Sequence, residues 1–260
     1  MSNVSDDRPI ALVTGATAGI GTAFCRALAA DGYRLVLSAR NEERLKELAE
    51  SFDGAEVLPL DLSTDDGMGR LERFAASRRI DMLVNNAGFG LSGTFLKVPA
   101  ADEVAMHRLH TEAVLRGTLA VLPGMVERGG GRIVNTASVA AFFPGSTYAA
   151  SKSWVVSFSQ SVASEVAAHG VNVTALCPGF TRTEFHQRAG MNMSKLPEFM
   201  WLDADRVVKV GLHHNRHGKA VSVPALQYKA MSTLGRLLPM GLSSKVLGTI
   251  SRRRVESARH

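Results

Sequence analysis

The sequence predicts a doubly wound α/β domain whose seven-stranded, mostly parallel sheet carries helices on both faces. Short apolar runs alternate along the chain with segments of helical periodicity, which is the pattern of βα units that build a parallel sheet. The first apolar run ends in a glycine-rich turn that leads directly into a helix. The 260 residues, of which 45% are hydrophobic, are enough for one large core. We therefore expect one domain over residues 1–260, with the strand order 3-2-1-4-5-6-7.

Charge and cysteine content exclude several classes of protein. The formal net charge of +6 is scattered until the last third of the chain, so it indicates an anionic cofactor and a basic tail, and no nucleic-acid partner. The only cysteines, Cys25 and Cys177, exclude a disulfide framework and favour a reducing compartment. No apolar run approaches the ~20 residues of a membrane span, and residues 1–9 lack the core of a signal peptide. We expect a cytoplasmic protein.

The glycine-rich turn follows the first expected strand, residues 10–13. Glycines let the backbone turn tightly and approach a phosphate, while the free N–H groups and the dipole of a helix N-terminus favour negative charge. The order strand, glycine turn, helix therefore predicts a dinucleotide site. Its candidate residues are Gly15, Thr17, Ala18, Gly19, Ile20 and Gly21.

The next three expected strands bring polar residues to the same edge of the sheet. Residues 35–40 end in Arg40, where a dinucleotide fold meets the adenosine ribose, and an arginine there suits a 2′-phosphate. Arg40 therefore favours NADP(H), with NAD(H) possible, although it could simply be a solvated arginine. Residues 57–62 and 80–88 carry Asp61, Leu62 and Asn86, candidates for holding the adenine end. A helix cap and an Asx turn are the alternatives for Asp61 and Asn86.

A tyrosine, a lysine and a serine form the candidate catalytic group. Residues 99–128 are expected to form a long helix, and residues 132–138 form a fifth strand that delivers Ser138 to the crevice. Tyr148 and Lys152 then lie one helical turn apart on one face. The ammonium beside the phenol favours the phenolate and thus lowers the tyrosine pKa, while Ser138 can hold a substrate oxygen. The alternative is an ordinary pair on a helix surface.

Taken together, these motifs resemble those of the short-chain dehydrogenase/reductase (SDR) family. The resemblance covers residues 10–185 and implies a Rossmann-type sheet that binds NAD(H) or NADP(H). Tyr148 would then be the acid/base, Lys152 would lower its pKa and bind the nicotinamide ribose, and Ser138 would orient the substrate. The motifs are Thr14-Gly-x-x-x-Gly-Ile-Gly21, Asn85-Asn-Ala-Gly88, Ser138, Tyr148-x-x-x-Lys152 and Pro178-Gly179. The loop residues that would hold the carboxamide end of the cofactor are Pro178, Gly179, Thr181 and Thr183.

Two departures from the family pattern affect these expectations. Ala18 stands where NADP-dependent members usually carry a basic residue, so Arg40 alone must supply the preference for NADP(H). His110 stands where the family usually has a catalytic asparagine that anchors a water between the lysine and solvent. An imidazole could bridge that water and titrate near neutral pH. A core histidine with a satisfied hydrogen bond is the alternative.

The last third of the sequence suggests the substrate and the oligomeric state. Residues 184–202 resemble the family's substrate lid, and their apolar character suits an apolar or amphipathic ketone, aldehyde or alcohol, unless they only pack on the sheet. Residues 171–177 and 220–223 are the last two expected strands. His213, His214 and His217 have no cysteine or carboxylate nearby at a spacing that suits zinc ligands, so no metal is expected.

An amphipathic basic tail is expected over residues 225–260, including the arginines 252–254. Packing on a neighbouring subunit of a homodimer or homotetramer is favoured over binding to an anionic membrane surface. The sequence thus predicts an NADPH-dependent reductase of an apolar ketone or aldehyde, or the reverse alcohol oxidation. The alternatives are a catalytically weak NADP(H)-binding regulator and a membrane-peripheral lipid or 3-oxoacyl reductase.

Overall fold

The computed structural model describes residues 7–143, 145–191, 193 and 196–237. Within these residues one seven-stranded sheet has the order β3-β2-β1-β4-β5-β6-β7, and each neighbouring pair is parallel. The predicted order is confirmed, and the described sheet is parallel throughout. The strands are β1 (Ile10–Thr14), β2 (Arg34–Ala39), β3 (Glu56–Pro59), β4 (Met82–Asn85), β5 (Gly131–Thr136), β6 (Val171–Leu176) and β7 (Val221–Ser222).

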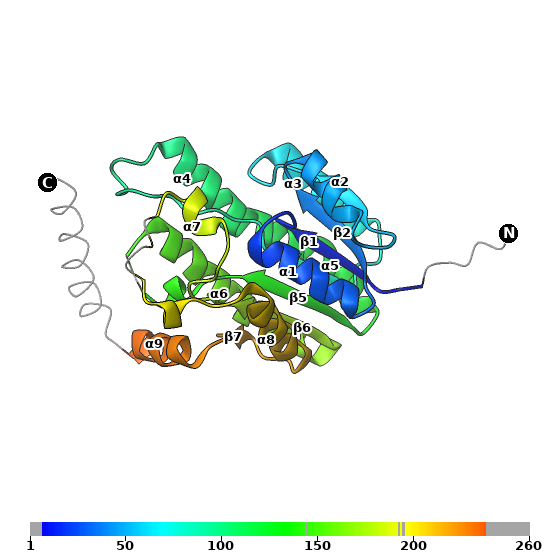
Figure 1. Cartoon of the computed structure of the whole chain (residues 1–260). Helices are drawn as coiled ribbons and strands as arrows, with labels where there is room; N and C mark the ends of the chain where they lie inside the picture. The colour runs from blue at the N-terminus through cyan, green and yellow to red at the C-terminus, as the bar shows by residue number, and fades with distance from the viewer. Residues whose placement is uncertain (1–6, 144, 192, 194–195, 238–260) are drawn as a thin grey trace, which may run out of the picture.

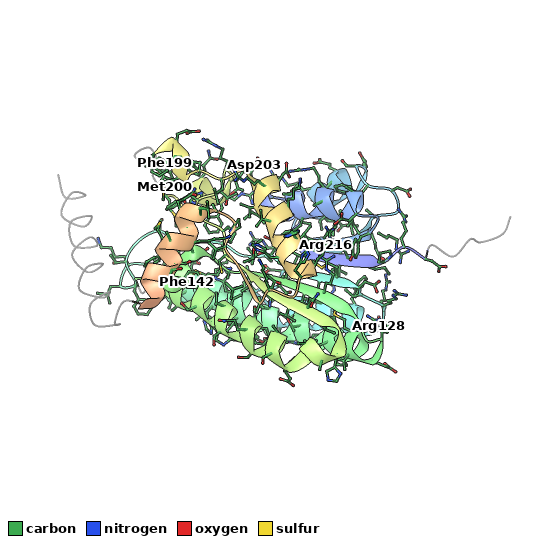
Figure 2. All side chains as sticks on the ribbon, turned by 90° about the horizontal axis from the view of Figure 1, so that it is seen from below. Arg128, Phe142, Phe199, Met200, Asp203 and Arg216 are labelled. Atoms are coloured by element: carbon green, nitrogen blue, oxygen red, sulfur yellow. The ribbon has the colours of Figure 1, made fainter. Side chains whose placement is uncertain are left out.

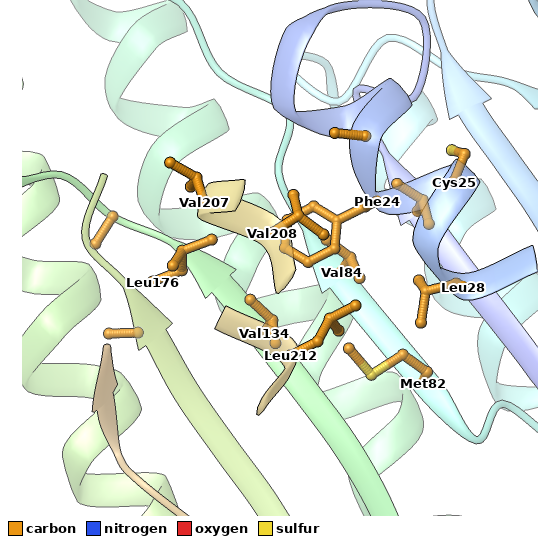
Figure 3. Packing of buried hydrophobic residues seen from close by; sticks show 14 of the residues in the cluster. Phe24, Cys25, Leu28, Met82, Val84, Val134, Leu176, Val207, Val208 and Leu212 are labelled. Carbon is orange, nitrogen blue, oxygen red and sulfur yellow. The ribbon is translucent and has the colours of Figure 1, made fainter. Parts of the chain in front are cut away.

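Helices cover both faces of the sheet (Figure 1). One apolar layer joins the strands to α1 (Gly19–Ala30), α2 (Glu42–Ala49) and α8 (Ala204–Arg216). The other joins them to α3 (Asp65–Ala76), α5 (Ala113–Glu127) and the C-terminal half of α6 (Thr147–Val166). In the first layer, buried side chains of α1 (Phe24, Leu28) and α8 (Val207, Val208) pack together over side chains of the middle strands β4 and β5 (Figure 3). The strand residues are Met82, Val84 and Val134.

The long helix predicted over residues 99–128 is present, but its winding changes in the middle. It runs as α4 (Ala100–His107), a π-helical turn (Arg108–Glu112) and α5. π-Helical turns inside α-helices are rare and often mark functional sites. Here the turn contains His110, which it directs into the protein, where the side chain is 1% exposed.

Most strands end earlier than the sequence predicted, and after two of them, β3 and β5, a side chain starts a turn. After β3, the Asp61 carboxylate accepts hydrogen bonds from the Ser63 backbone N–H (2.9 Å) and the Ser63 hydroxyl (2.6 Å). After β5, the Ser138 hydroxyl accepts from the Ala140 N–H (3.1 Å) and caps a short 3₁₀ helix (Val139–Phe142). Asp61 and Ser138 therefore lie on loops just beyond the carboxyl ends of the strands, where α/β folds place their ligands.

The helix α9 (Leu226–Leu237) lies at the start of the predicted amphipathic tail. The remainder of that tail lies outside the described residues, and the tail as a whole stays a prediction. Tyr228 is fully buried; its hydroxyl accepts from the Phe180 N–H (3.1 Å) and donates to the Met200 carbonyl (2.7 Å). Its ring leaves no room at Gly179, where a Cβ would lie 2.1 Å from Cε2 of the tyrosine. Figure 2 shows Phe142, Phe199 and Met200 near α9. This helix thus fixes the loop that follows β6.

Two apolar residues of α9, Leu226 and Met231, are exposed in the described part of the chain.

We expect Tyr228→Phe to lower the free energy of unfolding by about 1–3 kcal/mol, because the buried Phe180 N–H loses its acceptor. Urea unfolding followed by circular dichroism measures the change. The control is Tyr33→Phe, whose partly exposed hydroxyl accepts from Arg132 at 3.3 Å and can be replaced by water. Equal losses in the two variants would show that the Tyr228 hydroxyl does not hold the loop.

Candidate active site

The glycine turn has the conformation that a phosphate site requires. Gly15 and Gly19 adopt φ angles of 65° and 51°, in the left-handed region that favours glycine. A Cβ at Gly21 would lie 2.0 Å from the Gly15 carbonyl oxygen, so no side chain fits there. No side chain caps the start of α1 at Ala18, which leaves the first N–H groups of the helix available to an anion. The residues present therefore fit the diphosphate of a dinucleotide.

The ends of β2 and β3 place a cation and an anion beside the turn. Arg40 is exposed, and no hydrogen bond or ion pair with another described residue holds its guanidinium. Burial acts to raise the pKa of Asp61, but the hydrogen bonds from Ser63 and the charge of Arg40 outweigh it and lower that pKa. The Asx turn that we considered for Asp61 is present. Leu62 is buried behind it. Contacts of these residues with the adenine end stay predictions.

Asn86 connects three strands at the crevice. Its amide donates to the carbonyls of Thr14 and Gly15, both at 3.2 Å, and its oxygen accepts from the Thr136 hydroxyl at 3.2 Å. The amide is therefore engaged with the framework that holds the glycine turn. Its expected contact with the adenine end stays a prediction.

Ser138, Tyr148 and Lys152 meet at the carboxyl end of β5. The lysine is 5% exposed, its Nζ lies 5.8 Å from the centroid of the tyrosine ring, and it donates to the Thr136 carbonyl at 2.8 Å. The Ser138 side chain acts on the tyrosine hydroxyl in the direction that lowers its pKa. The structure thus brings together the three residues that the sequence singled out, from a loop and from the first two turns of α6.

Burial dominates the proton equilibria of this group. It raises the pKa of Tyr148 to about 12, although the hydrogen bond with Ser138 acts in the opposite direction. It lowers the pKa of Lys152 to about 8. The lowered tyrosine pKa expected from the sequence is therefore wrong for the structure described here. The reason is that desolvation disfavours both charged forms, and the ammonium is directed to the Thr136 carbonyl.

His110 lies against Tyr148, with ring centroids 5.5 Å apart and planes at 77°. Its Nδ1 is 2.9 Å from the Ser151 hydroxyl, which donates its proton to the Tyr148 carbonyl at 2.8 Å. With that proton on the carbonyl, Nδ1 donates to the Ser151 oxygen and Nε2 is the acceptor; the opposite tautomer requires the hydroxyl to turn towards Nδ1. Nε2 is buried without a hydrogen-bond partner among the described residues.

The imidazole of His110 is held neutral. Burial, followed by the charge of Lys152, lowers its pKa well below the usual value. The expectation that it titrates near neutral pH is therefore wrong. A Cβ at Gly88 would lie 2.8 Å from Nε2 and 3.7 Å from the Lys152 Nζ, so both nitrogens face the same narrow space beside the glycine. The geometry suits an acceptor of hydrogen bonds and not an acid.

The loop after β6 approaches the glycine turn. Side-chain carbons of Thr183 would lie 2.7 and 2.8 Å from a Cβ at Gly19, so the two segments are in close contact. The Thr181 hydroxyl is buried and donates to the Gly179 carbonyl at 3.0 Å, which shapes the loop after Pro178. Of the two threonines, Thr183 is the one placed beside the predicted phosphate site.

Sequence reasoning missed Ser151 and Thr136, and it gave Phe185 no role beyond its apolar character in the lid. Ser151 and Thr136 act through hydrogen bonds to His110 and Lys152, and Phe185 lies 6.0 Å from the Tyr148 ring. The position of Ser151 three residues after Tyr148 was the one available signal, because such residues share a helix face.

In the described part of the chain, no group of three metal-ligating side chains is placed to hold a metal ion. The Nδ1 atoms of His214 and His217 are engaged with the Ser222 hydroxyl (2.8 Å) and the His213 carbonyl (2.8 Å). Among the same residues, no helix is long and apolar enough to cross a bilayer.

Comparisons with known proteins identify the family. The short chain dehydrogenase family model matches residues 9–193. Sulfoacetaldehyde reductase 2 of Chromohalobacter salexigens is 39% identical over 68% of this chain and 74% of its own. Acetoacetyl-CoA reductase of Allochromatium vinosum is 37% identical over 67% and 75%. A short-chain dehydrogenase from Sphingobium yanoikuyae, solved in complex with NADPH, has a TM-score of 0.81 and 34% identity over 87% of this chain and 93% of its own. The chain therefore belongs to the short-chain dehydrogenase/reductase family and is an NAD(P)-dependent oxidoreductase acting on C=O or CH–OH groups.

Proposed function

We propose that the protein reduces an apolar or amphipathic ketone or aldehyde with NADPH, or catalyses the reverse alcohol oxidation. The observation that carries this proposal is the meeting of Ser138, Tyr148 and Lys152 beside an uncapped glycine turn. A tyrosine pKa of about 12 keeps the phenol protonated at neutral pH. A protonated phenol is the form that gives a proton to a carbonyl oxygen, so it suits reduction.

Each residue has a distinct task in this reaction. When bound at the glycine turn, NADPH would supply the hydride that the carbonyl carbon takes up. The Ser138 hydroxyl donates a hydrogen bond to the carbonyl oxygen and fixes its position. The Tyr148 hydroxyl gives its proton to the same oxygen, which becomes the alcohol. The positive charge of Lys152 then stabilises the phenolate that remains until a proton is recovered from solvent.

Arg40 supports the preference for NADPH. It is exposed directly after β2, no hydrogen bond or ion pair with another described residue holds its guanidinium, and its charge lowers the pKa of Asp61. A guanidinium forms charge-assisted hydrogen bonds with a 2′-phosphate, and these are stronger than its hydrogen bond with the neutral 2′-hydroxyl of NADH.

The lid segment supports an apolar substrate. Phe185 of the lid lies on the Tyr148 ring. His110 lies against the same ring, and Phe89 lies 6.4 Å from His110, so the surroundings of the tyrosine are mostly aromatic. The relatives reduce chemically different carbonyls, as their names state, so the family alone does not decide the substrate. A 3-oxoacyl thioester is a second candidate because one relative is an acetoacetyl-CoA reductase. A catalytically weak regulator is disfavoured, because the three catalytic side chains are retained.

We propose further that His110 completes a proton path from Lys152. Its unpartnered Nε2 and the ammonium face the same space beside Gly88, which suits a bridging water. Because the imidazole stays neutral, it holds this water by accepting a hydrogen bond and does not store the proton itself.

The first test is Tyr148→Phe, measured by NADPH absorbance with a panel of apolar ketones, aldehydes and acetoacetyl-CoA. The variant should lose at least ~100-fold in kcat/KM because only the proton donor is removed. NADPH affinity, measured by fluorescence titration, should change less than about twofold. A variant that keeps more than about 5% of the activity would contradict the assignment of Tyr148.

The cofactor test is Arg40→Ala. Affinity for NADPH should fall by about 1.5–3 kcal/mol, the size of a hydrogen bond to a charged group, and affinity for NADH should not change. The matched control is Arg44→Ala, which removes an exposed arginine from α2 and should leave both affinities intact. Equal losses for the two cofactors in Arg40→Ala would refute the 2′-phosphate contact.

The test of the proton path compares His110→Leu, His110→Asn and Ser151→Ala. The leucine variant should slow turnover about tenfold, the loss of a hydrogen bond worth ~1.4 kcal/mol, because an isobutyl group cannot hold a water. The asparagine variant should stay active. Neither it nor the parent should show a histidine titration between about pH 6 and 7, since burial keeps His110 neutral. Ser151→Ala removes the hydrogen bond that sets the tautomer of His110, so its turnover should lie between that of the parent and that of His110→Leu. Full activity of a folded His110→Leu protein would assign His110 to the core alone.

A further inference from the structure

Phe185 stands at one side of the candidate acid/base. It begins the short helix α7 (Phe185–Arg188), and its ring lies 6.0 Å from the Tyr148 ring with planes at 52°. His110 lies against the same tyrosine at 5.5 Å. The reacting end of a substrate therefore has to reach Tyr148 between an aromatic side chain of the lid and the framework.

The lid approaches the chain after β4 very closely at this point. A Cβ at Gly90 would lie 3.1 Å from the tip of the Phe185 ring (Cζ), and 3.4 Å from both Ala189 Cβ and Met191 Cε. The lid also has a glycine at this contact, because a Cβ at Gly190 would lie 3.1 Å from the Ser92 hydroxyl oxygen. The absence of side chains at Gly90 and Gly190 thus allows the lid and the chain after β4 to pack closely. The wall beside Tyr148 is formed by the Phe185 ring and has little spare room.

The position of Phe185 is imposed by the residue that follows it. His186 is directed into an aromatic group, 5.6 Å from Phe180 and 5.4 Å from Trp201, where burial lowers its pKa and keeps it uncharged. The hydroxyl of Tyr228 holds the Phe180 N–H and the Met200 carbonyl, as described above. α7 is therefore held by the aromatic contacts of His186, and the Phe185 ring lies between His186 (5.5 Å) and Tyr148 (6.0 Å).

We propose that Phe185 determines how wide a carbonyl substrate can be at Tyr148. A carbonyl oxygen held by the Ser138 and Tyr148 hydroxyls places one of its two substituents towards the phenylalanine ring. A flat or slim substituent fits beside that ring, and a branched or second aryl substituent collides with it. This inference rests on the proposed carbonyl reduction and specifies its substrate class as ketones and aldehydes with one slim side.

The test is the ratio of kcat/KM for wide ketones, with two aryl or branched substituents, to that for methyl ketones. Phe185→Ala should raise this ratio at least about tenfold, the scale of discrimination by apolar volume in a pocket. Phe185→Trp should lower it. Gly90→Ala should also lower it, because the new methyl group pushes the ring by a few tenths of an ångström. The matched control is Phe199→Ala, which truncates a 72% exposed phenylalanine of the same segment and should leave the ratio unchanged.

A second measurement separates this inference from the proposed function. Calorimetric titration of the NADPH complex with non-reducible amides of matched widths reports the same preference without turnover. If the parent binds slim amides and Phe185→Ala gains the wide ones, Phe185 is confirmed even if no ketone is reduced, and then only the proposed reaction fails. If the folded Phe185→Ala protein shows the parent's width preference in both measurements, the inference is overturned.

Discussion

The active site depends on the hydrogen bonds that join the ends of β1, β4 and β5 through Thr14 and Asn86. The Thr14 hydroxyl donates to the Val84 carbonyl at 3.2 Å and accepts from the N–H groups of Asn86 (2.9 Å) and Ala87 (3.1 Å). The side-chain NH2 group of Asn86 donates a hydrogen bond to the carbonyl of Gly15, and the side-chain oxygen of Asn86 accepts one from the Thr136 hydroxyl. The backbone carbonyl of Thr136 in turn accepts a hydrogen bond from the ammonium group of Lys152. A shift of Asn86 would therefore move the phosphate turn and the catalytic lysine together.

The buried lysine and tyrosine show why this framework has to be rigid. Burial makes the charged form of each group costly, so the pKa of Lys152 falls while that of Tyr148 rises. A proton can pass to a carbonyl oxygen at little further cost only if the hydroxyl of Ser138 and the lysine ammonium are already in place. The rigid strand ends supply that placement, because Asn135 also ties β5 to α6 through the Ser159 hydroxyl at 2.9 Å.

The sequence predicted the sheet order and the meeting of Ser138, Tyr148 and Lys152 because both follow from the alternation of strands and helices and from helical spacing. It could not predict the pKa directions, which depend on how deeply each group is buried. It assigned His110 to the right place but with the wrong protonation, because the tautomer is set by Ser151 and the pKa by burial. Phe185 was seen only as one apolar lid residue, since its contact with Gly90 joins positions nearly a hundred apart in sequence.

The lid reaches both halves of the site through neighbouring residues. Thr183 packs against Gly19 of the phosphate turn, and Phe185, two residues later, lies on Tyr148. A substitution that moves this short segment therefore acts on cofactor and substrate at once, unless it removes only side-chain volume. Truncating Phe185 leaves in place the Thr183 contact and the contacts of His186 with Phe180 and Trp201. If only the phenylalanine ring is removed, the preference for substrate width should change while the affinity for NADPH does not. A displaced lid would change both the width preference and the NADPH affinity.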